Sequence, residues 1–197
     1  YEALDAVWRN YCISDILEPG STFKPFTIAG ALEDGVVKDS DTFFCKGYEI
    51  VAEGTSPIYC HNRSGDGTLT LKQALEQSCN VALMQIAKSE VRQILDENGS
   101  IIENNEPELV RKTISKTTSD LMKQYMAGVV TEGTGSRAAV DGYTIGGKTG
   151  TAEKIPRNQG NYVLSFIGFS PVENPQIMLY VAVDEPNVES QSTSGAG

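Results

Sequence analysis

The stretch EPGSTFKPFTIAGALEDG, residues 18–35, decides how the N-terminal half of the chain folds. A turn signal at its start is followed by apolar residues at three- and four-residue steps, the spacing of one helix face. Pro25 falls in the first turn, where its missing N–H costs no hydrogen bond. The stretch therefore predicts a helix that starts near Ser21 and ends at Gly35.

Two further helices are expected after this one. Thr70 and Gln73 form a capping box that opens the second helix. Ser78 is predicted to cap the third helix, which runs over residues 81–88. The tripeptide Ser78-Cys79-Asn80 would then lie at the junction between two helices.

Strand signals dominate the rest of the chain. RQILDENGSIIE predicts a hairpin that turns at Asn98-Gly99. SDLMKQYMAGVV predicts a helix with one broad apolar face, made of Leu121, Met122, Tyr125, Met126 and Val129. The runs YTIGGKTGTAEKI, NYVLSFIGFS and QIMLYVAVDE predict an antiparallel meander. Helices first and strands last indicate the α+β class, with an antiparallel sheet packed against helices.

Composition limits the function. The chain has 197 residues, a formal charge of −10 and a single histidine, His61. One domain is expected, nucleic acid is excluded as a partner, and so is a site with several histidine ligands. No apolar run approaches the roughly 20 residues that cross a bilayer. Because the chain starts at Tyr1 without a methionine, it is expected to be a piece of a longer protein.

The four cysteines are Cys12, Cys45, Cys60 and Cys79. They contain no C-x-x-C pair, and Cys60-His61 lacks the further ligands that zinc requires, so neither a metal nor a cofactor is expected. Cys45 and Cys60 bracket a loop-like stretch. They are interpreted either as a disulfide or as two reduced thiols packed under that loop.

Three short motifs could carry chemistry together: Ser21-Thr22-Phe23-Lys24, Ser78-Cys79-Asn80 and Lys148-Thr149-Gly150. A serine and a lysine three residues apart share one helix face, so the amine can reach the hydroxyl. A lysine that acts as a base must lose its proton near neutral pH, which requires burial or a neighbouring cation. Lys148 is the expected neighbour.

With their flanking residues, these motifs resemble a known family. EPGSTFKPF, the SCN element preceded by TLKQALEQ, and EGTG followed by GYTIGGKTGTAEK are similar to the transpeptidase domain of class B penicillin-binding proteins, in the serine β-lactamase and D,D-peptidase superfamily. The resemblance implies Ser21 as the acylated nucleophile and Lys24 as its base. It implies Ser78 as a proton relay, Asn80 as a substrate contact and Lys148 as the source of local potential.

The resemblance also implies the substrate site and the setting. Thr149, Gly150 and Thr151 would bind substrate, and the backbone N–H groups of Ser21 and Thr151 would form an oxyanion hole. The implied reaction is D,D-transpeptidation of peptidoglycan stem peptides, inhibited covalently by β-lactams and needing no cofactor. The implied location is the extracytoplasmic face of a bacterial membrane, reached through an N-terminal anchor outside this sequence. Cell-wall synthesis proteins would be the partners.

The sequence departs from the family pattern in its middle. Asn80 and Lys148 are 68 positions apart, fewer than the family normally shows, and glycine-rich segments are missing near residues 88–91. The chain also stops before the helix that normally covers the sheet. We therefore expect residues 1–197 to form a β-lactamase/transpeptidase-like domain that is internally and C-terminally truncated.

Three alternatives remain open at this point. The first is a β-lactam-binding sensor or inert module, and the second is a serine β-lactamase, although no glutamate between Ser78 and Lys148 stands in a recognisable motif for a deacylating base. The third is a nucleotide-binding P-loop at residues 142–149, with Asp184-Glu185 as the metal-binding acids. A P-loop must open a helix, and the glycines and proline after Lys148 argue against one.

Overall fold

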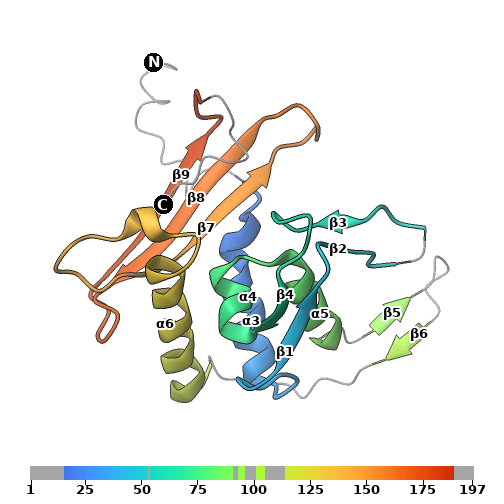
Figure 1. The fold of residues 1–197 in the computed structure, drawn as a ribbon, viewed down its shortest axis with the longest axis horizontal. Coiled ribbons are helices and arrows are strands. Elements are labelled where there is room, and N and C mark those ends of the chain that lie inside the picture. The colour runs from blue at the N-terminus through green and yellow to red at the C-terminus, as the bar shows by residue number, and fades with distance from the viewer. Residues whose placement is uncertain (1–15, 53, 91–92, 96–100, 105–113, 189–197) are drawn as a thin grey trace.

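The computed structural model describes residues 16–188, apart from 53, 91–92, 96–100 and 105–113. Within these residues, a three-stranded antiparallel sheet lies on one side, and the α-helices with several short strands lie on the other (Figure 1). This arrangement confirms the predicted α+β class with an antiparallel sheet packed against helices.

The first helix begins with a 3₁₀ turn. That turn, η1, spans Gly20–Phe23, and the α-helix α3 continues from Lys24 to Glu33. Pro25 lies in the first turn of α3, as predicted, and the backbone of Gly35 turns away with a φ of 71°. Ile28 is fully buried, so α3 forms part of the core.

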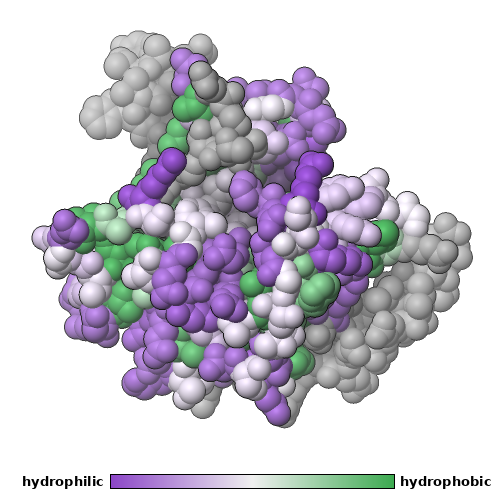
Figure 2. Space-filling view, viewed as in Figure 1, coloured by the Kyte–Doolittle hydropathy of each residue, from purple (hydrophilic) through white to green (hydrophobic). Residues whose placement is uncertain are grey.

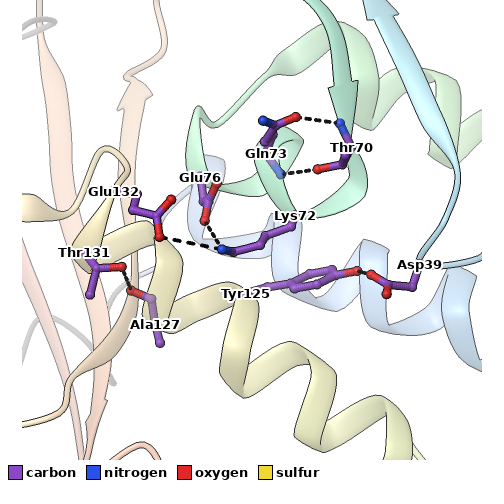
Figure 3. A network of polar contacts seen from close by, with 9 residues as sticks. All are labelled: Asp39, Thr70, Lys72, Gln73, Glu76, Tyr125, Ala127, Thr131 and Glu132. Carbon is purple, nitrogen blue, oxygen red and sulfur yellow. Dashed lines mark hydrogen bonds and ion pairs between the residues drawn. The ribbon is translucent and has the colours of Figure 1, made fainter.

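The second and third helices follow closely on one another. In α4 (Leu71–Glu76) both bonds of the predicted capping box are present between Thr70 and Gln73 (Figure 3). The predicted cap of the third helix was wrong by one residue. The helix α5 spans Asn80–Glu90, and the sulfur of Cys79 accepts a hydrogen bond from the Ala82 N–H at 3.4 Å. The Ser78 hydroxyl is thereby left for other contacts.

The C-terminal meander is confirmed. Strands β7 (Gly146–Glu153), β8 (Tyr162–Ser170) and β9 (Ile177–Asp184) pair in that order, all antiparallel. Lys148 lies inside β7, where it pairs with Ile167. Because no helix opens at Lys148, the P-loop alternative fails.

The helix α6 (Lys116–Thr131) packs against both β7 and α3. It buries Met122, Tyr125 and Val129, as its apolar face predicted. The Tyr125 hydroxyl bonds to the carboxylate of Asp39 (Figure 3). This helix therefore joins the sheet to the helical part of the molecule.

Short strands complete the fold. Strand β1 (Thr42–Cys45) pairs with β4 (Gly67–Thr70). Strand β2 (Tyr48–Glu49) pairs with β3 (Ile58–Tyr59), within the stretch interpreted as a loop. Strands β5 (Gln93–Leu95) and β6 (Ile101–Asn104) form the predicted hairpin, although its turn lies outside the described residues.

On the face shown in Figure 2, the coloured surface is mainly hydrophilic, with scattered hydrophobic areas. On the last strand, β9, Ile177, Met178 and Leu179 are exposed. No helix in the described part of the chain is long and apolar enough to span a membrane.

Candidate active site

The turn that carries Ser21 rests directly on β7. Gly20 has a φ of 57°, and a Cβ built on it would lie 3.1 Å from the carbonyl oxygen of Thr151. A Cβ on Gly150 would lie 2.3 Å from the Ser165 hydroxyl oxygen, well inside any normal contact. The same Cβ would lie 2.9 Å from Cγ2 of Thr22 in η1. The absence of side chains at both glycines therefore lets η1 lie against the strand, which brings the Ser21 and Thr151 segments side by side.

Lys24, one helical turn after Ser21, points to the start of α5. Its Nζ donates to the carbonyl oxygen of Ser78 at 2.6 Å, to the Ser78 hydroxyl at 3.2 Å and to Oδ1 of Asn80 at 2.7 Å. Among the hydrogen bonds of the described residues, none joins Lys24 to the Ser21 hydroxyl. Lys24 of the first motif is thus hydrogen-bonded to Ser78 and Asn80 of the second motif.

Lys148 reaches the same serine from the sheet. Its side chain is fully buried, and its Nζ donates to the Ser78 hydroxyl at 2.9 Å. It also donates to the carbonyl oxygen of Thr149 at 3.0 Å and to the Thr149 hydroxyl at 3.3 Å. The Ser78 hydroxyl therefore receives hydrogen bonds from two lysines of different motifs.

Burial lowers the pKa of both lysines. Desolvation lowers the pKa of Lys24 to about 8, although the nearby sulfurs of Cys79 and Cys60 oppose this shift. Desolvation, followed by the charge of Lys24, lowers the pKa of Lys148 well below its ordinary value. Two amines in one dry site repel each other when both are charged, so they favour a state with a single positive charge. A neutral amine next to a serine is what base catalysis requires.

Asn80 is held from both ends of its amide. Oδ1 accepts from Lys24, while Nδ2 donates to the carbonyl oxygen of Tyr59 at 2.9 Å. A pocket of about 370 Å³ opens beside it, between α3, β3 and α5. Lys24 and Asn80 line this pocket together with Gly20, the residue before Ser21. The pocket can admit a ligand to the polar network.

Thr134 is a site residue to which the sequence analysis assigned no role. Its hydroxyl lies 2.9 Å from the hydroxyl of Thr149, and its N–H donates to the carbonyl oxygen of Glu76 at 3.1 Å. A Cβ on the preceding Gly133 would lie 2.5 Å from that same carbonyl oxygen. The signal was present in the sequence, because Thr134 belongs to the EGTG element quoted for the resemblance.

An ion-pair network lies next to the contact between Thr134 and Glu76, and Figure 3 shows its residues. Lys72 of α4 lies 3.3 Å from the buried carboxylate of Glu76 and 3.7 Å from that of Glu132, just after α6. A hydrogen bond and the charge of Glu76 raise the pKa of Lys72. The network holds the end of α4, two residues before Ser78, against the end of α6.

The cysteines near the site are unpaired. Cys45 and Cys60 are thiols with their sulfurs 3.5 Å apart, which matches the second of the two interpretations and not the disulfide. The sulfur of Cys79 lies 3.5 Å from that of Cys60. His61 is exposed, and Cys12 lies outside the described residues.

Comparison with known proteins gives one family. The model of the penicillin binding protein transpeptidase domain matches residues 2–94 and 90–197. Stage V sporulation protein D of Bacillus subtilis is 26% identical over 258 residues, which cover 90% of this chain and 40% of the relative. The probable peptidoglycan D,D-transpeptidase PenA of Neisseria flavescens is 27% identical over 243 residues, which cover 90% of this chain and 60% of the relative. The chain therefore spans about half the length of these relatives.

Solved structures share the fold. PBPA from Mycobacterium tuberculosis superposes with a TM-score of 0.73 at 16% identity, covering 93% of this chain and 60% of that one. A peptidoglycan glycosyltransferase from Burkholderia ambifaria gives a TM-score of 0.71 at 24% identity, covering 94% of this chain and 77% of that one. The predicted transpeptidase-like fold is thus confirmed.

Proposed function

The chain belongs to the penicillin binding protein transpeptidase domain family, and from that premise we propose that it is the catalytic part of a serine D,D-transpeptidase acting through Ser21. The observation that carries the proposal is the position of the Ser78 hydroxyl between the amines of Lys24 and Lys148. All three motifs of the resemblance supply one group each to this arrangement.

The proposed reaction has two steps, acylation of Ser21 and transfer of the acyl group. A neutral Lys24 takes the proton of the Ser21 hydroxyl as its oxygen attacks the penultimate D-Ala carbonyl of a stem peptide. The C–N bond breaks as the Ser78 hydroxyl passes its proton to the departing D-Ala amine and takes the proton held by Lys24, which becomes neutral again. An amine of a neighbouring stem peptide then attacks the ester carbonyl and gives a proton to Lys24. The ester C–O bond breaks, and this proton passes to the departing Ser21 oxygen, which restores the Ser21 hydroxyl.

The surroundings of Ser21 fit this reaction. The backbone N–H groups of Ser21 and Thr151 are proposed as the oxyanion hole, which is supported by the contact between η1 and β7. The hydroxyls of Thr149 and Thr151, with the Gly150 backbone between them, are proposed to bind the substrate carboxylate. Lys148 donates to the Thr149 hydroxyl beside this site, and Asn80 is proposed to contact the substrate amide.

The setting is proposed on the same basis. The substrates are peptidoglycan stem peptides, with β-lactams as covalent mimics, and the site of action is the extracytoplasmic face of a bacterial membrane. The partners are other cell-wall synthesis proteins.

We also propose that the chain lacks a segment that the family normally has. The two segments matched by the family model meet at residues 90–94, which supports a missing family segment at that point.

The test is covalent labelling by benzylpenicillin, followed by intact mass. The chain is expected to gain one adduct, and Ser21→Ala none. Ser136→Ala, at an exposed serine, is the matched control and should label like the parent. Equal labelling of Ser21→Ala would refute the assignment of the nucleophile.

A penicillin-binding module without turnover is the second candidate. It is favoured by the hydrogen bonding of Asn80, whose amide is occupied by Lys24 and Tyr59. Such a module would form the adduct but release no D-Ala from an acyl-D-Ala-D-Ala peptide. A serine β-lactamase would instead hydrolyse nitrocefin with many turnovers.

A further inference from the structure

Four potential metal ligands meet beside the active site. They come from four places in the fold: Cys45 ends β1, Cys60 follows β3, Asp66 precedes β4 and Cys79 precedes α5. One ligand atom from each lies within 4.8 Å of all the others. The three cysteines are buried and the aspartate is partly buried. This is a compact set of three sulfurs and one carboxylate.

The sulfur separations fit a shared ion better than a disulfide. Cys60 lies 3.5 Å from Cys45 and 3.5 Å from Cys79. A disulfide would require about 2.05 Å. A tetrahedral ion with bonds of ~2.3 Å to sulfur separates its sulfur ligands by roughly 3.8 Å. The sulfurs therefore need to move only slightly to surround one ion.

Two backbone segments lie in close contact beside the cluster. A Cβ on Gly65 would lie 2.4 Å from the carbonyl oxygen of Cys45, and a Cβ on Gly47 would lie 2.1 Å from that of Arg63. Both glycines also have a positive φ. Two chain segments can cross here only because these residues lack side chains, and the crossing places Asp66 beside Cys45.

Hydrogen bonds orient the ligands. The N–H of Val81 donates to the sulfur of Cys60 at 3.3 Å, and that of Ala82 donates to the sulfur of Cys79 at 3.4 Å. The side chain of Asn62 donates to the Asp66 carboxylate at 2.9 Å. Hydrogen bonds that fix the direction of each ligand are typical of protein metal sites.

We propose that Cys45, Cys60, Asp66 and Cys79 bind one zinc ion in a closed, tetrahedral site. Thiolate ligands select zinc over magnesium or calcium, and four protein ligands leave no open position for catalysis. The site is structural. No metal was expected from the sequence because no two of these residues form a ligand motif, and the ligands come together only when β1, β4 and α5 assemble.

The ion has a direct connection to the active site. Cys79 stands between Ser78 and Asn80, the two residues that bond to Lys24. Ser78 has a φ of 53°, a conformation that needs support from its surroundings. Zinc bound to Cys79 would fix this turn to the β1–β4 pair, so it positions Ser78 without contacting substrate.

The test measures metal content in the whole chain. The protein is reduced under nitrogen, loaded with zinc, desalted and analysed by mass spectrometry for zinc per chain. About one ion per chain is expected. Cys60→Ser and the milder Asp66→Asn should lose most of it, while Asp141→Asn, at an exposed aspartate, should retain it. Cobalt loaded in place of zinc should give a thiolate-to-metal absorption band that Cys60→Ser weakens.

Each outcome bears on the proposal. A reduced wild-type chain that binds no zinc overturns it, as does wild-type zinc content in both ligand variants. Thermal unfolding covers the case in which Cys60→Ser fails to fold, because zinc should raise the wild-type Tm more than that of Asp66→Asn. These readouts need no catalysis, so they remain valid whether or not Ser21 is the nucleophile.

Discussion

Lys24 and Lys148 donate to the same oxygen, the Ser78 hydroxyl, at 3.2 and 2.9 Å. Lys24 lies at the start of α3 and Lys148 lies in β7, so this oxygen joins the helical part of the fold to the sheet. The shared acceptor also keeps two buried amines close enough to influence each other's protonation.

Replacing Ser78 by alanine should therefore affect chemistry more than stability. The variant removes the oxygen that receives both amines and, on the proposed mechanism, the proton relay. Acylation by benzylpenicillin is expected to slow by about 10²–10⁴-fold, the usual contribution of one proton-transfer group. Rapid-mixing kinetics measure the rate, with Ser136→Ala as the exposed control. Acylation as fast as in the parent would exclude a role for Ser78.

Acylation should depend on pH through Lys24. Only the neutral amine accepts a proton, and burial lowers its pKa to about 8. Raising the pH through 8 increases the neutral fraction, so the acylation rate constant should rise through pH 8, where half of the amine is neutral, and level off above it. Lys24→Arg should lose most activity at every pH, because a guanidinium remains charged. A profile that falls between pH 7 and 9 contradicts this assignment.

Much of the site could be predicted from the sequence, because its strongest signals are local. The capping box at Thr70 and the i, i+3 spacing of Ser21 and Lys24 depend on residues within one turn of each other. The meander follows from alternation and glycine turns. These features depend on neighbouring residues, so the tertiary structure changes where they lie but not how they form.

The remaining features arise from tertiary contacts that no local pattern encodes. The contact between Thr134 and Thr149 depends on how α4, α6 and β7 pack. The thiol cluster forms because the β1–β4 pairing brings Cys45 opposite Gly67, next to Asp66. The displaced cap has a similar cause: Ser78 is engaged by two distant lysines, so Cys79 takes the position before the helix.

Gly150→Ala should disturb the contact between η1 and β7. The new methyl group would lie 2.3 Å from the Ser165 hydroxyl oxygen and 2.9 Å from Cγ2 of Thr22, the neighbour of Ser21. The expected loss in free energy of unfolding is about 1–3 kcal/mol, typical of overpacking. Urea denaturation measures it. The double variant Gly150→Ala/Ser165→Ala removes the closest clash and should recover part of the loss. If the single variant is as stable as the parent, the strand does not require a glycine here.

Thr134→Val tests the residue that the sequence analysis missed. Valine keeps the shape of threonine but cannot hydrogen-bond to the Thr149 hydroxyl, which Lys148 also contacts. Without this partner the Thr149 hydroxyl should bind a substrate carboxylate less well. The loss of one hydrogen bond of about 1 kcal/mol corresponds to a roughly fivefold weaker affinity of the noncovalent complex with benzylpenicillin. The concentration dependence of acylation separates this binding step from the maximal rate, which should change little because neither lysine is altered. Thr131→Val is the matched control, since its hydroxyl donates to the carbonyl oxygen of Ala127 within α6 (Figure 3). Equal weakening by both substitutions would attribute the effect to a general disturbance of the end of α6 and the turn after it, and would remove Thr134 from the site.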